Sequence, residues 1–129
     1  MSVWAVLMVA LAGGLGAAAR FAADAAVRSR TGDRFPWGTA VVNVSGSFVI
    51  GCATGGALFH GWLGGVDGTQ FAIIAVGFCG GFTTFSTAMA ESVRLVQSDA
   101  WRSALINAFG TLVTCTAVAA AGVGVIYAI

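Results

Sequence analysis

The sequence contains no lysine, and its 129 residues include one proline, Pro36, and one histidine, His60. Only 9% of the residues are charged, whereas a soluble domain averages about 25%. Without lysine and with a single histidine, an acid–base or nucleophilic active site lacks its usual residues, and we expect no enzyme. The net charge of +1 also gives no electrostatic reason to bind nucleic acid.

Apolar residues and glycine make up most of what is present. Hydrophobic residues account for 58% of the chain, and there are 19 glycines. This composition is typical of a membrane-embedded protein in which small residues allow close contact between helices. The three cysteines form no CxxC pair, and we interpret them as small buried residues rather than as metal or redox groups.

Four apolar segments are each long enough to cross a bilayer, which needs roughly 20 residues. The expected spans are residues 3–27, 36–59, 69–96 and 101–129. The loops between them are short, which leaves no room for a soluble domain. The sequence therefore predicts an all-α membrane protein with one four-helix transmembrane domain over residues 1–129.

The arginines are distributed unevenly between the two sides of the predicted bundle. Five of them flank the first and third loops: Arg28, Arg30, Arg34, Arg94 and Arg102. The N-terminal end, the second loop and the C-terminal end contain none. The positive-inside rule places both arginine-bearing loops in the cytoplasm and both termini outside the cell membrane.

The third span contains the run Gly77-Phe-Cys-Gly-Gly-Phe-Thr-Thr-Phe-Ser-Thr87. Glycine and threonine at this density weaken a helix. A broken backbone at membrane depth is tolerated only where it is buried in protein or lines a wet cavity. The run therefore predicts an ion or substrate site rather than a simple membrane anchor.

Rows of small and polar residues follow the second and fourth spans at four-residue spacing. Their members are Thr39, Asn43, Ser47, Gly51, Gly55, Ser103, Asn107, Thr111, Cys115 and Ala119. Such rows serve either helix packing or a pore wall. We favour packing for Ser47, Gly51 and Gly55. An amide in mid-span is costly unless it is paired or wet, so we favour the pore for Asn43. For Thr39, Asn107 and Thr111, helix packing and a pore wall remain equal alternatives.

Few ionisable residues lie inside the spans. Arg20 either reaches the interface, pairs with Asp24 one turn later, or lines a vestibule for anions. Glu91 is more typical of a contact to a neighbouring helix end than of proton chemistry. Hydroxyls, amides and the positive edges of phenylalanine rings suit a small, hard anion, whereas a cation pathway would more naturally carry carboxylates.

Three motifs occur in order along almost the whole chain. They are Gly13-Gly-Leu-Gly-Ala-Ala-Ala-Arg-Phe21, Pro36-Trp-Gly-Thr-Ala-Val-Val-Asn-Val-Ser-Gly-Ser-Phe48 and the 77–87 run. Together they resemble the Fluc/CrcB family of fluoride channels. The resemblance implies an antiparallel dimer with two fluoride pores, passive export of fluoride and resistance to it. It also implies a third helix broken at mid-membrane, with a central structural sodium ion held by the backbone carbonyls of Gly80 and Thr83.

The resemblance assigns pore positions residue by residue. Asn43 matches the pore asparagine, Thr39 the hydroxyl one turn before it, and Phe85 the first phenylalanine whose edge faces fluoride. Arg20 and Thr111 match positions in the first and fourth helices. The neighbouring hydroxyls of Thr84 and Ser86 complete the expected fluoride-lining set.

The chain departs from the family pattern at Ala88, Asn107 and Cys115, where a second phenylalanine, a tyrosine and a serine are usual. The missing aromatic and the arginine bias together suggest a fixed orientation and an oppositely oriented homologous partner. A working homodimer is the alternative.

Two other classes of function fit parts of the pattern. A small four-helix proton-coupled drug exporter fits the length, although its deep first-span carboxylate is represented only by Asp24. A membrane scaffold without transport fits the glycine content but leaves the Thr-Thr-Phe-Ser-Thr cluster unexplained.

Overall fold

The computed structural model describes residues 2–129, which are helical apart from short connections. Four helical runs are long and apolar enough to cross a membrane: Val3–Thr31, Trp37–Phe59, Thr69–Gln97 and Trp101–Tyr127. Their bounds agree with the predicted spans to within four residues at each end.

The runs divide into the following elements. The first two are the helices α1 (Val3–Thr31) and α2 (Trp37–Phe59), followed by the short turn η1 (Trp62–Gly64). The third comprises α3 (Thr69–Phe71), η2 (Ala72–Cys79), α4 (Gly80–Phe82) and α5 (Phe85–Gln97). The fourth comprises α6 (Trp101–Leu105), η3 (Ile106–Gly110) and α7 (Thr111–Tyr127). The segments η2 and η3 are wider π-helical turns within their runs.

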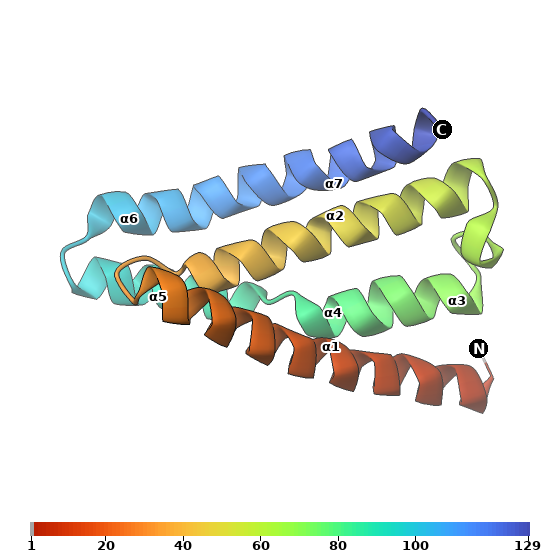
Figure 1. Cartoon of the computed structure of the whole chain (residues 1–129), viewed down its shortest axis with the longest axis horizontal. Helices are drawn as coiled ribbons and strands as arrows, with labels where there is room; N and C mark the ends of the chain where they lie inside the picture. Colours follow the sequence, from red (N-terminus) through yellow and green to blue (C-terminus); the bar gives the residue numbers. More distant parts are fainter. Residues whose placement is uncertain (1) are drawn as a thin grey trace.

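The runs lie side by side, with α2 between α7 and the third run (Figure 1). The start of α1, the end of α7 and the connection from α2 to α3 lie at one end of the bundle. The α1–α2 and α5–α6 connections lie at the opposite end. The two arginine-bearing loops therefore share one end of the molecule, and their assignment to the cytoplasm stays a prediction.

The first helix is longer than predicted, because it continues through Arg28 to Thr31. The Arg28 guanidinium lies 3.2 Å from the carboxylate of Asp24 one turn earlier, and such a pair supports the helix. Gly32 then adopts a φ of +71°, which ends α1. The predicted loop over residues 28–35 was thus wrong in its first four residues, which are helical.

Close helix contact depends on glycine at specific positions. A Cβ atom on Gly51 of α2 would overlap the backbone carbonyl of Ala119 in α7. A Cβ atom on Gly16 of α1 would overlap the carbonyl of Phe78 in η2. These contacts bring α2 against α7 and α1 against the third run, and the packing role predicted for Gly51 agrees with them.

Large apolar side chains cover the outside of the bundle. Exposed examples are Trp4, Leu11, Leu15, Phe21, Trp101, Phe109 and Leu112. A soluble monomer rarely exposes contiguous apolar surface on this scale. This outer surface suits contact with lipid chains or with another membrane protein.

Candidate ion-conducting site

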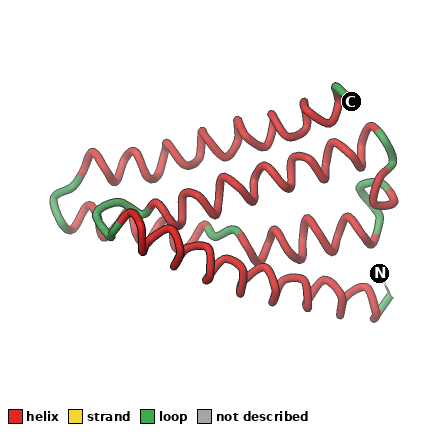
Figure 2. Tube along the Cα trace, viewed as in Figure 1, coloured by secondary structure: helices red, strands yellow, loops and turns green. Residues whose placement is uncertain are grey.

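The backbone of the third run leaves the helix at two residues. Helix α4 ends at Phe82 and α5 begins at Phe85. Between them, Thr83 has φ −80° and ψ 160°, and Thr84 has φ −149° and ψ 119°, so both are extended. Figure 2 shows this non-helical stretch within the third run. We refer to Thr83 and Thr84 as the unwound turn.

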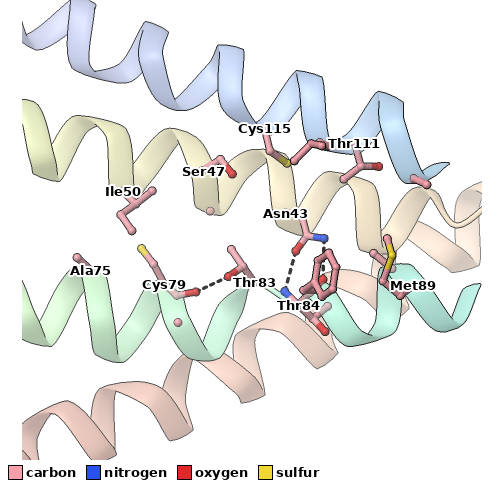
Figure 3. Close-up of a pocket in the computed structure, with 16 residues that line it drawn as sticks. Asn43, Ser47, Ile50, Ala75, Cys79, Thr83, Thr84, Met89, Thr111 and Cys115 are labelled. Atoms are coloured by element: carbon pink, nitrogen blue, oxygen red, sulfur yellow. Dashed lines mark hydrogen bonds between the residues drawn. The ribbon is translucent and has the colours of Figure 1, made fainter. Parts of the chain in front are cut away.

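Asn43 of α2 binds the unwound turn through both ends of its side-chain amide. Its Nδ2 donates to the carbonyl oxygen of Thr84 at 2.9 Å, and its Oδ1 accepts from the Thr84 N–H at 2.7 Å. Both bonds are drawn in Figure 3. Asn43 is 8% exposed. One Nδ2 hydrogen remains for a further acceptor, because a primary amide has two N–H groups.

The Thr84 hydroxyl caps the helix that follows. Its oxygen accepts from the backbone N–H of Thr87 at 3.2 Å, and its proton is donated to the Thr87 hydroxyl at 2.9 Å. Ser86 Oγ lies 3.4 Å from the same hydroxyl oxygen. Thr84 is therefore the N-cap of α5, which fixes where the helix resumes.

The break changes the partners of two backbone carbonyls. In a continuous helix the N–H of Thr84 would bond the carbonyl of Gly80, and that of Thr87 the carbonyl of Thr83. Here those N–H groups are taken by Asn43 and by the Thr84 hydroxyl. The Thr83 carbonyl instead accepts from the Arg20 guanidinium at 3.3 Å. Both carbonyls are thus available for partners outside their own helix.

A groove of about 360 Å³ opens beside the unwound turn (Figure 3). It is bordered by α2, the third run and the fourth run, and its lining is mostly apolar. It is lined by Asn43, Gly46, Ser47, Ile50, Ala75, Cys79, Gly80, Thr83, Thr84, Phe85, Ala88, Met89, Ala108, Thr111, Leu112 and Cys115. Phe85 is 77% exposed, so its ring is not covered by the rest of the chain.

A second hollow of about 360 Å³ lies between α1, α2 and α5 and is more polar. It is lined by Ala17, Arg20, Phe21, Asp24, Thr39, Val42, Thr84 and Thr87. Thr84, which Asn43 binds, borders both hollows. We call this hollow the vestibule.

The structure groups most of the predicted site residues around these two hollows. Asn43, Phe85, Thr111, Gly80 and Thr83 line the groove. Arg20 and Thr39 line the vestibule, and Thr84 borders both. The exposed Ser86 lies beside the Thr84 hydroxyl but lines neither hollow.

The pairing of Arg20 with Asp24, one of the sequence-based alternatives, is wrong. The Asp24 carboxylate binds Arg28, whose guanidinium also lies 3.5 Å from Asp33 and 3.4 Å from Glu91. Arg20 is left to donate to the unwound turn. The contact from Glu91 to the end of α1 agrees with the structural role expected for it.

One further residue was not foreseen at the site, and one residue left open by the sequence does not line it. Thr87 lines the vestibule and completes the cap of α5, and the Thr-x-x-Thr spacing is the only sequence signal for it. Asn107 is 1% exposed and donates to the Ala88 carbonyl at 3.0 Å and to Ser92 Oγ at 2.8 Å. Asn107 therefore packs the fourth run against α5 and lines neither hollow.

Replacing Arg28 with glutamine is expected to lower the stability of the subunit by about 1–2 kcal/mol, because a buried carboxylate loses its partner. The Glu91 side chain is only 10% exposed, whereas that of Arg28 is 40% exposed, so solvent moderates the loss. Thermal unfolding in detergent measures the effect. Arg30→Gln is the control, since Arg30 is exposed and makes no ion pair within residues 2–129. Equal stability of the two variants would contradict the network.

Comparison with known proteins shows similarity over nearly the whole chain. The profile of the family described as "CrcB-like protein, Camphor Resistance (CrcB)" matches residues 7–123. The chain is 49% identical over 119 residues to "Fluoride-specific ion channel FluC 1" of Leifsonia xyli, covering 92% of this chain and 82% of that protein. It is 43% identical over 126 residues to "Fluoride-specific ion channel FluC 4" of Brucella abortus, covering 96% and 92%. The FluC protein of Thermus thermophilus is 42% identical over 106 residues, with 82% of each chain covered.

Proposed function

The chain belongs to the CrcB (FluC) family of fluoride channels, and on this premise we propose that it carries fluoride passively out of the cytoplasm. The family is non-enzymatic, so the chain is a channel and not an enzyme. Export along the fluoride gradient would confer resistance to fluoride. The observation that carries the proposal is that Thr84, whose backbone is held by Asn43, borders both hollows.

The proposed path runs through the vestibule, past the unwound turn and into the groove. Arg20 and Thr39 would receive the anion in the vestibule, where the guanidinium supplies positive charge. Beyond Thr84, the remaining Asn43 N–H, the Thr111 hydroxyl and the Phe85 ring edge would replace its water. The Ser86 hydroxyl, next to that of Thr84, would add a donor near the turn. Neutral donors bind a dehydrated halide without trapping it.

The family resemblance adds a structural sodium ion, and the residues present fit one. Among residues 2–129 no three His, Cys, Asp or Glu side chains gather as a metal site, so backbone carbonyls would have to supply the ligands. The Gly80 carbonyl has lost its helical donor, and the Thr83 carbonyl keeps a second lone pair beside its bond from Arg20. A bound cation would neutralise these carbonyl dipoles in mid-membrane.

We further propose that the groove is completed by a second subunit in antiparallel orientation. Gly80 and Phe85 lie on a face that the single chain leaves open. The arginine-bearing loops share one end of the bundle, which favours one orientation of this chain in the membrane. The partner would then be an oppositely oriented homologue, and it would supply the aromatic that Ala88 lacks.

Co-expression with such a homologue tests the heterodimer. We expect fluoride efflux from liposomes containing both chains and none from liposomes containing this chain alone. Fluoride efflux is measured directly with a fluoride electrode in chloride-free buffer. Rapid efflux through this chain alone would refute the heterodimer and establish the homodimer in its place.

The two rival functions have less support. A drug exporter needs a free deep carboxylate, whereas Asp24 is already paired with Arg28. A scaffold would not need two hollows meeting at a helix break. Growth assays in cells lacking their own fluoride channel distinguish the channel, the drug exporter and the scaffold. The proposed channel, expressed with its partner, should restore growth in fluoride, while restored growth in ethidium alone would favour the exporter.

A further inference from the structure

We propose that Asn43 is a positioning residue for the unwound turn, in addition to offering one N–H to the ion path. Its side-chain amide makes two hydrogen bonds to one backbone residue, Thr84, at 2.7 and 2.9 Å. This pairing resembles one rung of a β-ladder, in which one residue's N–H and C=O are both satisfied by a neighbouring strand. The inference deepens the proposed function, on which its sodium and fluoride consequences rest.

The Asn43 amide satisfies the backbone groups of Thr84 where the helix is interrupted. In a continuous helix the Thr84 N–H would instead bond the Gly80 carbonyl. Asn43 accepts from the Thr84 N–H and donates to the Thr84 carbonyl, so Thr84 stays extended with its own N–H and C=O both paired. An unpaired group at this depth would be costly. The asparagine therefore stabilises the break itself.

The position of Asn43 makes this role specific. It is 8% exposed on α2 and follows Val42, which is fully buried. Because Val42 is buried, α2 is held in place at this point, and the Asn43 amide lies at a fixed distance from the unwound turn. A second contact, from Arg20 of α1 to the Thr83 carbonyl at 3.3 Å, holds the preceding residue. The turn is thus held from α1 and from α2, and Asn43 makes the shorter bonds.

The consequence is that Asn43 controls the Gly80 carbonyl. Once the Thr84 N–H is donated to Asn43, the Gly80 carbonyl has no helical donor and is available to a cation. Without Asn43, α4 and α5 can join into a continuous helix that takes this carbonyl back. Loss of Asn43 should therefore weaken sodium binding although Asn43 is no proposed ligand.

Hydrogen–deuterium exchange of the purified complex tests the positioning role directly. In Asn43→Leu, which keeps the volume but loses both bonds, the backbone around Thr84 should change its exchange rate by about 10-fold or more. Asn43→Asp keeps an acceptor for the Thr84 N–H and should retain most of the wild-type protection. Ser45→Ala is the matched control on the same helix, because Ser45 is exposed and bonds only carbonyls of α2.

Sodium chloride titration at constant ionic strength, with N-methylglucamine chloride as the replacement salt, gives the second readout. The sodium midpoint for thermal stabilisation should rise about 10-fold in Asn43→Leu, and less in Asn43→Asp. The negative charge of Asn43→Asp should still abolish fluoride efflux, which separates positioning from conduction.

The outcomes distinguish the inference from the function on which it rests. Unchanged exchange at Thr84 in Asn43→Leu, or an equal change of exchange in the Leu and Asp variants, would overturn the positioning role. A wild-type protein whose stability ignores sodium would overturn the sodium site instead, and the exchange comparison would still decide the role of Asn43.

Discussion

Replacing Gly80 with valine is expected to give a folded subunit that no longer assembles. A Cβ atom at Gly80 meets no other atom within 4 Å in the single chain, so the subunit itself has room for a side chain. Gly80 lines the open groove. A valine there would project where the partner and the proposed sodium ion must approach. We therefore expect loss of the dimer and loss of all sodium-dependent stabilisation.

The adjacent glycine supplies the contrast. A Cβ atom on Gly81 would overlap the Gly13 carbonyl of α1, so Gly81→Val should damage the subunit itself. Gly14→Val controls for helix propensity, because Gly14 is exposed and a Cβ there also meets nothing within 4 Å. Crosslinking and size-exclusion chromatography report assembly, and circular dichroism reports folding. A normal dimer of Gly80→Val would refute the carbonyl site at the subunit interface.

Replacing Asn43 with leucine is expected to reduce fluoride efflux about 100-fold. Each buried polar group left without its partner costs about 1–3 kcal/mol, and each 1.4 kcal/mol corresponds to about a factor of 10. Two effects combine here, because leucine removes an N–H from the proposed path and removes both bonds to Thr84. A fluoride electrode measures efflux from liposomes containing the variant complex.

The exposed neighbour Ser45 gives the matched control for conduction as well. Ser45→Ala removes a polar group of α2 that borders neither hollow, and its efflux should equal that of the wild type. A lost buried hydrogen bond should change fluoride efflux by much more than a factor of about two. If the efflux through Asn43→Leu lies within that factor of the efflux through Ser45→Ala, Asn43 is not part of the pathway.

The sequence carried strong signals for the spans and for the location of the site. Hydropathy located the four long runs to within four residues at each end. Local chemistry also marked the 77–87 run, because glycine has a low helix propensity and threonine a lower one than alanine or leucine. These features depend on residues close in sequence, so no three-dimensional information was needed to find them.

The partners of the polar groups could not be read in the same way. Asn43 and Thr84 are 41 residues apart, and Arg20 and Thr83 are 63 apart. Such pairs depend on which helices pack together, and residue spacing along one helix does not reveal that packing. For this reason the sequence suggested the neighbouring Asp24 for Arg20, whereas Asp24 binds Arg28. Asn107 likewise looked equally suited to a pore or to packing until its contact with Ala88 was seen.

The most direct test of the whole account is the ion selectivity of the purified channel. Liposomes loaded with equal fluoride and chloride, and containing this chain with its oppositely oriented partner, should release fluoride rapidly and retain chloride. The neutral donors around Thr84 predict that discrimination, because they match a small halide stripped of water. Release of both halides at similar rates, or retention of both, would contradict a fluoride path through the unwound turn.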